Sequence, residues 1–528
     1  DGNATEYANV ADSDLWLFHR FAALGNRDGR IENTVYNFMG GFEGRVGEVD
    51  LEFGARYVES RATDVGQNYV VGGLAQVQID EGNYNIYDPF AGDPGALGFT
   101  ATIYRDMKTT QKEFFGSAAF DLFDMAGGSS AMVLGAEFRE EYYQDNYDPL
   151  SESGQIVGSA GNSASGGRDV WAAYTELLFP VLDNLELNFA GRYERYSDYG
   201  SDFAPKVSVR WQPLDTLTLR ATYGEGFRAP PLNLLTQKTS FSAAATNDPA
   251  TCQMLVGRPD CSTQVTTYSI ANPNLTSEQS KQFGFGVVWD ATDWLNVTVD
   301  YYDIEITDSI AGVGVSTVVG CLRGTTAICP SGISEFPQGT TVPNESLGLG
   351  AQFDPATGGI VNAQTGSANI GWIDTRGIDG TIRTNFDMGG WGTMRNMLAF
   401  SNVFEYRSNG GTNAVNYMGY PKYRASLSNS WNVNDFTFVW NLSYIHKTRA
   451  DNPALNEANG FSPNVASWTI HDVQVSYDAP WNATITLGVN NVANKEPAFD
   501  QRLGGSSYDS YLYDPWGRVP YVRYTQRF

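Results

Sequence analysis

Apolar and polar side chains alternate along much of the chain with a period of two. In the segment Leu185–Glu194 the odd positions are mostly apolar and the even positions mostly polar. Successive side chains of a β-strand point to opposite faces, so this pattern predicts strands with one apolar and one polar face. No stretch shows a persuasive helical period of 3.6. The same alternation returns in four further segments, residues 206–211, 217–223, 295–301 and 436–444.

The connections between the strand candidates alternate between short and long. We count about eighteen candidates of ten or more residues. Long antiparallel strands with short turns at one end and long loops at the other are typical of an outer-membrane β-barrel, whereas a soluble β-sandwich or propeller would have strands of about five or six residues. We therefore predict an all-β fold, a transmembrane antiparallel β-barrel. The short links are 212–215, 290–293, 388–391 and 432–435, and the long ones are approximately 61–110, 146–167, 227–278, 308–367, 448–465 and 491–517.

Composition supports a wall that faces lipid on one side. Only 42% of the residues are apolar and no run of eighteen apolar residues occurs, so the chain codes for no transmembrane helix. Charged residues make up 18%, below the ~25% of an ordinary globular protein, while aromatic residues reach 13%. The formal net charge of −26 argues against nucleic acid as a partner. The acidic residues of the chain concentrate in the predicted loops, where they suit a hydrated surface or attract cations.

The four cysteines fall in two close pairs, Cys252 with Cys261 and Cys321 with Cys329. There is no CxxC motif, and none of the three histidines is near a cysteine. We therefore expect no metal site and two short-loop disulfides, formed in an oxidising compartment. If the last strand ends in the periplasm, the short turns are periplasmic and both disulfides lie in long extracellular loops.

Five further segments follow one another in a fixed order over about 330 residues: 191–213, 219–232, 272–280, 489–497 and 513–528. They contain YSDYG, GFRAPP, NPNLTSE, NNVANKEP and YDPWGR. In this order they resemble the middle and the end of the barrel of TonB-dependent outer-membrane transporters. In such proteins a terminal aromatic residue is read by the insertion machinery, so the resemblance gives this role to Phe528.

The resemblance implies an outer-membrane receptor of a Gram-negative bacterium. It would take up a scarce, bulky nutrient such as a siderophore or an oligosaccharide, with energy from the TonB complex and with outer-membrane lipid around it. Barrels of this family have 22 strands and an N-terminal plug. Nothing here resembles the plug, and residue 14 already has the strand pattern. We therefore expect residues 1–528 to form one barrel domain without the plug and the first two hairpins, its first strand rising from the periplasm.

Aromatic side chains in the predicted loops are candidates for ligand contact, because their faces stack on sugar rings or on catecholates. For residues near strand ends, such as Trp372, an aromatic girdle at the lipid border is the alternative. Arg228 shares its parity with Arg220 and should face the lumen, where an ion pair with Glu225 or another acidic neighbour is the alternative to ligand contact. The candidate ligand-binding residues are Tyr84, Tyr87, Phe90, Arg228, Trp372 and Tyr508.

The sequence offers no catalytic constellation and no cofactor site. It has no plausible Ser-His-Asp set and no phosphate loop, and a β-bulge explains His471–Asp472, which lies at a slip of parity. We predict that the protein is not an enzyme, which disfavours an outer-membrane hydrolase. A passive diffusion porin of about 16–18 strands is the alternative function, because it would match the strand count without missing hairpins.

Overall fold

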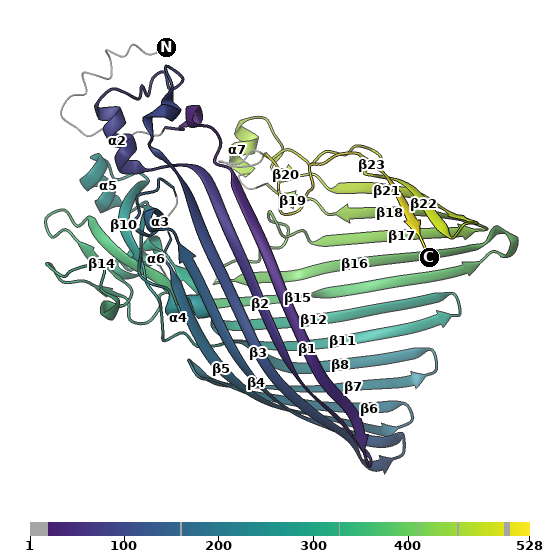
Figure 1. Cartoon of the computed structure of the whole chain (residues 1–528). Helices are drawn as coiled ribbons and strands as arrows, with labels where there is room; N and C mark the ends of the chain where they lie inside the picture. The colour runs from purple at the N-terminus through teal and green to yellow at the C-terminus, as the bar shows by residue number, and fades with distance from the viewer. Residues whose placement is uncertain (1–18, 159–160, 327, 410, 451–452, 501–506) are drawn as a thin grey trace.

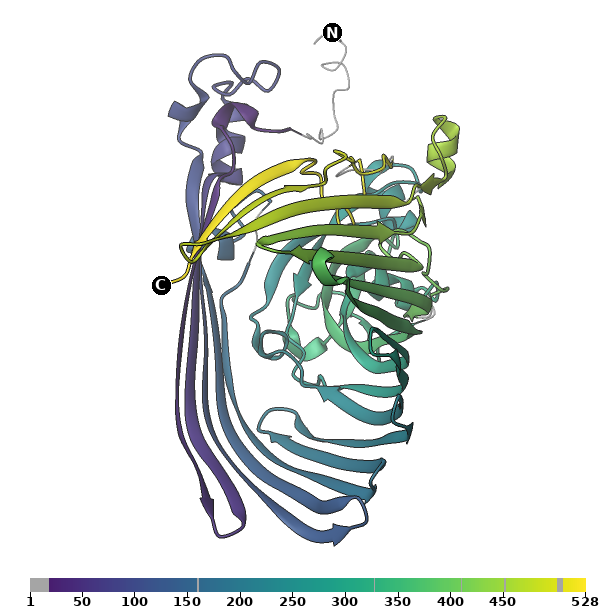
Figure 2. The same cartoon turned by 90° about the vertical axis from the view of Figure 1, so that its right-hand side faces the viewer.

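The computed structural model describes residues 19–158, 161–326, 328–409, 411–450, 453–500 and 507–528. Seventeen of their strands pair antiparallel, each with the next, in one curved sheet, which confirms the predicted fold class (Figure 2). Within these residues β1 pairs only with β2, and β23 only with β22. The strand predicted around residue 14 lies outside the described residues. The seventeen strands are β1 Gly29–Val46, β2 Val49–Val70, β3 Thr100–Met125, β4 Gly128–Tyr147, β5 Ala164–Leu182, β6 Leu185–Tyr196, β7 Gly200–Leu214, β8 Leu217–Arg228, β11 Glu278–Thr292, β12 Leu295–Val313, β15 Ile360–Asp387, β16 Thr393–Ser408, β17 Tyr423–Val433, β18 Phe436–Ile445, β21 Trp468–Ala479, β22 Ala483–Asn490 and β23 Val519–Gln526.

Tight turns gather at one end of the sheet and long loops at the other (Figure 1). We call these the turn end and the loop end. One loop-end link is short, because residues 197–199 alone join β6 to β7. β1 begins at the loop end and reaches the turn end at Val46. The strand predicted to rise from the periplasm is the one around residue 14, so its direction stays a prediction. An odd number of strands that finishes at the turn end must begin at the loop end.

Short helices occur in the loops and in one turn, and none that the structure describes has the length and hydropathy of a membrane-spanning helix. The helices are η1 Ala22–Leu24, α2 Gly72–Asp80, η2 Pro94–Leu97, α3 Pro149–Glu152, α4 Leu232–Thr236, α5 Pro249–Val256, α6 Val315–Leu322, η3 Glu345–Leu347, η4 Gly389–Trp391 and α7 Pro453–Ala458.

The two faces of the wall differ, as the alternation predicts. On β17 the residues Ala425, Leu427 and Trp431 share one face, and Arg424 and Ser426 share the other. The apolar face must meet lipid and the polar face the lumen. Aromatic pairs lie on the outward face close to the turn end, with ring centroids 5.0–5.3 Å apart: Trp294–Phe386, Trp431–Phe438 and Phe436–Tyr477. They form the aromatic girdle expected at the periplasmic lipid border.

The two longest loops fold together into one module. Residues 229–277 and 314–359 supply four short strands that join the loop-end part of β15, and β10 runs parallel to β15. Apolar side chains of both loops form a common core, which includes Val265, Val318, Val319 and Ile360. The four strands are β9 Ser240–Thr246, β10 Thr263–Ser269, β13 Ser334–Glu335 and β14 Gly350–Phe353; a separate pair, β19 Thr448–Arg449 and β20 Asn464–Val465, lies in another loop.

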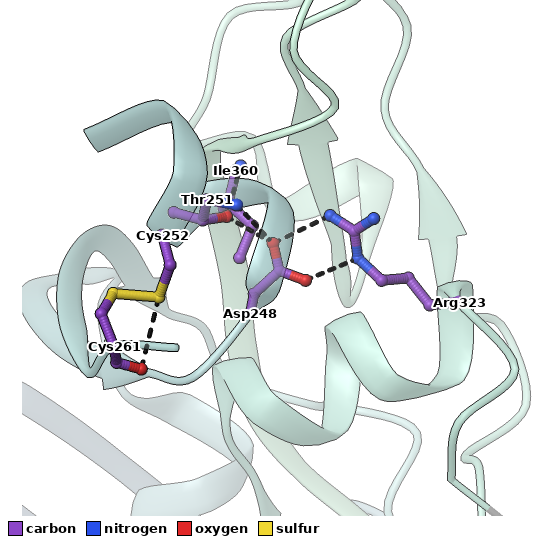
Figure 3. The surroundings of a disulfide bond; sticks show 6 residues. All are labelled: Asp248, Thr251, Cys252, Cys261, Arg323 and Ile360. Carbon is purple, nitrogen blue, oxygen red and sulfur yellow. Dashed lines mark hydrogen bonds and ion pairs between the residues drawn. A yellow bond between two sulfur atoms is a disulfide. The ribbon is translucent and has the colours of Figure 1, made fainter. Parts of the chain in front are cut away.

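Both predicted disulfides form within this module, Cys252–Cys261 and Cys321–Cys329. A buried carboxylate links the two disulfide-bearing segments (Figure 3). Asp248 caps α5 by accepting from the Thr251 backbone N–H at 2.9 Å, and Arg323 at the end of α6 donates to it through Nε at 2.8 Å. Because the ion pair joins loops 75 residues apart, the two loops are held as one body.

Candidate ligand-binding site

The lumenal face of β4–β6 carries a closed network of ion pairs. Arg192 lies 2.6 Å from both Glu137 and Glu194, and Arg139 approaches the same two carboxylates at 3.2 Å. The Tyr196 hydroxyl also donates to Glu194, whose side chain is only 7% exposed. Each arginine of this cluster therefore has its charge matched by carboxylates, which leaves it little capacity to bind an anionic ligand.

Arg424 on β17 stands in a different environment. It projects from the lumenal face at the loop end, in register with Ser401 of β16 and Ile445 of β18. In the part of the chain that the structure describes, no carboxylate lies within 4 Å of its guanidinium. Guanidinium is a planar fork that binds paired oxygen atoms, so Arg424 is a donor ready for an anionic group.

Two tyrosines stack beside Arg424. The rings of Tyr406 and Tyr420 lie 4.6 Å apart at 29°. The loop residues 411–422 hold them together: Asn413 accepts from the Tyr406 backbone N–H, and Tyr420 donates its N–H to Tyr417. A flat aromatic surface next to an unpaired guanidinium suits a ligand that is both aromatic and anionic.

Two pockets meet at Arg424. The upper one has a volume of about 210 Å³ and lies under the tyrosine pair, against Thr375 and Gly419. The lower one has a volume of about 470 Å³ and extends down the lumenal wall past Asp300 and Asp379. Asp300 is already bound to Arg220 at 2.7 Å. We call Arg424, Tyr406, Tyr420 and these pockets the Arg424 niche.

The predicted residue Tyr84 is buried. It packs against Val70 and Phe99 in the core of the loop between β2 and β3, and its hydroxyl contacts His19 at 2.8 Å. Burial raises the pKa of the Tyr84 hydroxyl. The structure therefore places Tyr84 inside the loop and away from a ligand surface, because a neighbouring element that is distant in sequence covers its ring.

Three other predicted aromatics lie in the loops. Tyr87 and Phe90 are 73% and 68% exposed in the loop between β2 and β3. Tyr508 is half-buried and packs against a cluster that contains Trp468 and Tyr513. None of these three residues lines either of the pockets at Arg424, and their role in ligand contact stays a prediction.

Arg228 forms an ion pair with Glu278. On the sequence alone, such an ion pair is the alternative to ligand contact by Arg228. Its Nη2 donates to Oε1 of Glu278 at 2.7 Å. The same carboxylate oxygen accepts from the Ile310 backbone N–H at 2.7 Å, where the register of β12 shifts. Arg228 and Glu278 thus tie the base of the 229–277 loop to the wall, while the exposed guanidinium edge stays open to solvent.

Trp372 lies on the outward face of β15. It shares parity with Asp374 and Arg376, opposite the lumenal residues Ile373 and Thr375. This position favours the girdle interpretation over ligand contact from the lumen. Phe528 is fully exposed just beyond β23, and Val522 and Tyr524 share its parity, as the sequence predicts.

The sequence interpretation missed the Arg424 niche, although part of its signal was present. The alternation in 423–433 places Arg424 on the polar face of a strand. Two features depend on loops that the pattern does not describe. No described carboxylate lies within 4 Å of Arg424, and Tyr420 folds onto Tyr406. Among the described residues no group of His, Cys, Asp and Glu could hold a metal ion.

Comparison with known proteins agrees with this architecture. A family model described as "TonB dependent receptor-like, beta-barrel" matches residues 2–492. The chain is 23% identical over 345 residues to the iron-regulated outer membrane virulence protein of two strains of Vibrio cholerae serotype O1. The alignment covers 64% of this chain and 42% of that protein, so the chain spans less than half of these relatives.

Solved structures are similar over nearly the whole chain. The siderophore receptor PirA from Acinetobacter baumannii matches with a TM-score of 0.61 at 15% identity, over 94% of this chain and 62% of that one. The outer membrane transporter YddB from Escherichia coli gives 0.61 at 13%, over 95% and 64%. A mutant of the ferric enterobactin receptor PfeA from Pseudomonas aeruginosa gives 0.55 at 14%, over 94% and 70%. At these identities the similarity establishes the fold alone.

Proposed function

The chain belongs to the family of TonB-dependent receptor-like β-barrels, and from this premise we propose that it takes up ferric siderophores across the outer membrane, with energy from TonB. Members of this family are outer-membrane receptors and not enzymes. On this proposal residues 1–528 act as one barrel domain, and the long extracellular loops capture the ligand.

The observation that carries the proposal is the Arg424 niche. Its unpaired guanidinium, stacked tyrosines and pockets of about 210 and 470 Å³ suit an anionic ligand with aromatic rings better than a neutral oligosaccharide. The names of three relatives, an iron-regulated protein, a siderophore receptor and a ferric enterobactin receptor, support the same ligand class.

Uptake of radioactive iron by a deletion strain that carries the gene on a plasmid tests this function. The panel contains ferric complexes of catecholate, hydroxamate and carboxylate siderophores, with a labelled oligosaccharide as comparison. We expect uptake of a catecholate complex that disappears in a TonB-defective strain. Uptake that persists without TonB would favour a passive porin, and uptake of the oligosaccharide alone would reject the siderophore proposal.

A further inference from the structure

The outward face of β17 and β18 has an aromatic border at both ends. Tyr423 and Trp431 share this face at the two ends of a nine-residue stretch of β17, and Ala425 and Leu427 lie between them. A tilted transmembrane strand needs about 9–11 residues to cross the apolar part of a membrane. Since Trp431 belongs to the girdle at the turn end, Tyr423 lies at the level of the outer-leaflet headgroups.

A small cluster surrounds Tyr423 at this level. The His446 ring meets the Tyr423 ring edge-on at 5.1 Å, and the Tyr444 hydroxyl contacts Nδ1 of His446 at 3.1 Å. The ammonium of Lys422 lies 5.4 Å from the centre of the Tyr423 ring, and Lys447 follows His446 directly. We call these five residues the Tyr423 rim.

The cations of the Tyr423 rim have no carboxylate partner. Over the described ranges no acidic oxygen lies within 4 Å of Lys422 or Lys447. Two outward-facing lysines of β3 do have such partners, since Lys108 lies 3.1 Å from Glu59 and Lys112 lies 2.8 Å from Glu140. Lys422 and Lys447 therefore place two positive charges beside one histidine, in a chain with a net charge of −26.

We propose that the Tyr423 rim binds the phosphate group of an anionic lipid in the outer leaflet. Lys422 and Lys447 supply the positive charge, and His446 supplies a further ring nitrogen for hydrogen bonding. The apolar side chains directly below the rim, Leu398, Phe400, Leu427 and Leu442, provide a surface for the acyl chains. The site is separate from the Arg424 niche, because Tyr423 and Tyr444 lie on the face of the wall opposite to Arg424.

Binding of lipid A, a phosphorylated glycolipid, to the full chain in a neutral detergent tests this proposal. Native mass spectrometry and the thermal shift on titration measure the affinity. We expect the double variant K422Q/K447Q to bind lipid A roughly 25-fold more weakly, because each lysine near an anionic lipid surface contributes roughly fivefold. The variant K422R/K447R should keep most of the affinity.

The matched control is K206Q, which removes an exposed lysine from the lumenal face of β7 that also has no carboxylate within 4 Å among the described residues. Circular dichroism of all variants controls for folding. Equal weakening by K206Q would reject the site, since binding would then depend on overall charge. No difference between K422Q/K447Q and the parent chain would also reject it. A second titration uses inorganic phosphate; the same shift with phosphate alone would overturn the assignment to lipid.

Discussion

The lumenal faces of β4–β6 and of β15–β17 have the same architecture. They differ in whether their arginines have carboxylate partners. In the first, Arg139 and Arg192 share two carboxylates that are almost buried. In the second, Arg424 faces a pocket, and no carboxylate of the described residues is within 4 Å of it. A buried network of matched charges holds neighbouring strands in register, whereas an unmatched arginine is available to a ligand. The difference assigns a structural role to the first wall and a binding role to the second.

The largest effect should come from breaking the closed network. Replacing Glu194 by glutamine leaves Arg139 and Arg192 with one carboxylate fewer in a partly buried setting. We expect E194Q to lower the free energy of unfolding by about 3 kcal/mol and to leave the affinity for the siderophore unchanged. Thermal unfolding and ligand titration measure the two quantities. A loss of affinity without a loss of stability would reverse the roles of the two walls.

The next effect concerns the open wall. We expect R424Q to keep the stability of the parent chain and to weaken ligand binding by about 10- to 100-fold, because a charge-assisted hydrogen bond contributes about 1.5–3 kcal/mol. Equilibrium binding of the ferric siderophore to whole cells measures this. The control is R383Q, which removes another lumenal arginine without a carboxylate within 4 Å among the described residues, near the turn end. Equal losses in the two variants would mean that the lumen attracts the ligand by general charge.

Removing one ring of the stacked pair should have a smaller effect. Y420L keeps an apolar side chain over Tyr406 but removes the flat aromatic surface. We expect affinity to fall about three- to tenfold, in line with about 0.5–1.5 kcal/mol for an aromatic pair. A hydroxamate complex is the comparison ligand. Because it has no aromatic rings, its affinity should be the same for Y420L and for the parent chain.

The smallest effect should come from a lumenal ion pair in contact with water. Arg210 and Glu186 lie 3.2 Å apart with both side chains more than 40% exposed. We expect E186Q to change the free energy of unfolding by less than about 1 kcal/mol, because exposed pairs gain little over hydration. A change as large as that of E194Q would show that burial does not distinguish the two kinds of pair.

These regions also show what the sequence could predict. The strands, their faces and the turn end follow from a period of two, which is a local property that each segment carries by itself. The disulfides follow from cysteines that are close along the chain. The ion pair of Arg228 was anticipated, but its partner Glu278 lies fifty residues away and Glu225 was the neighbour considered.

The remaining features depend on contacts between distant segments. Tyr84 is buried because Val70 and Phe99 pack around it, and no local pattern distinguishes it from the exposed Tyr87. Among the described residues, the absence of a carboxylate within 4 Å of Arg424 results from the register of three strands and two loops.

The two disulfides also bear on how the chain reaches its membrane. Each joins cysteines only nine or eight positions apart. A crossed bond between Cys252 and Cys329 would close a loop many times longer, at an entropic cost higher by about 2 kcal/mol. The native pairing is therefore favoured while the polypeptide is still unfolded. Both bonds can form during export through an oxidising periplasm, and the module that they stabilise can assemble afterwards without any exchange of partners.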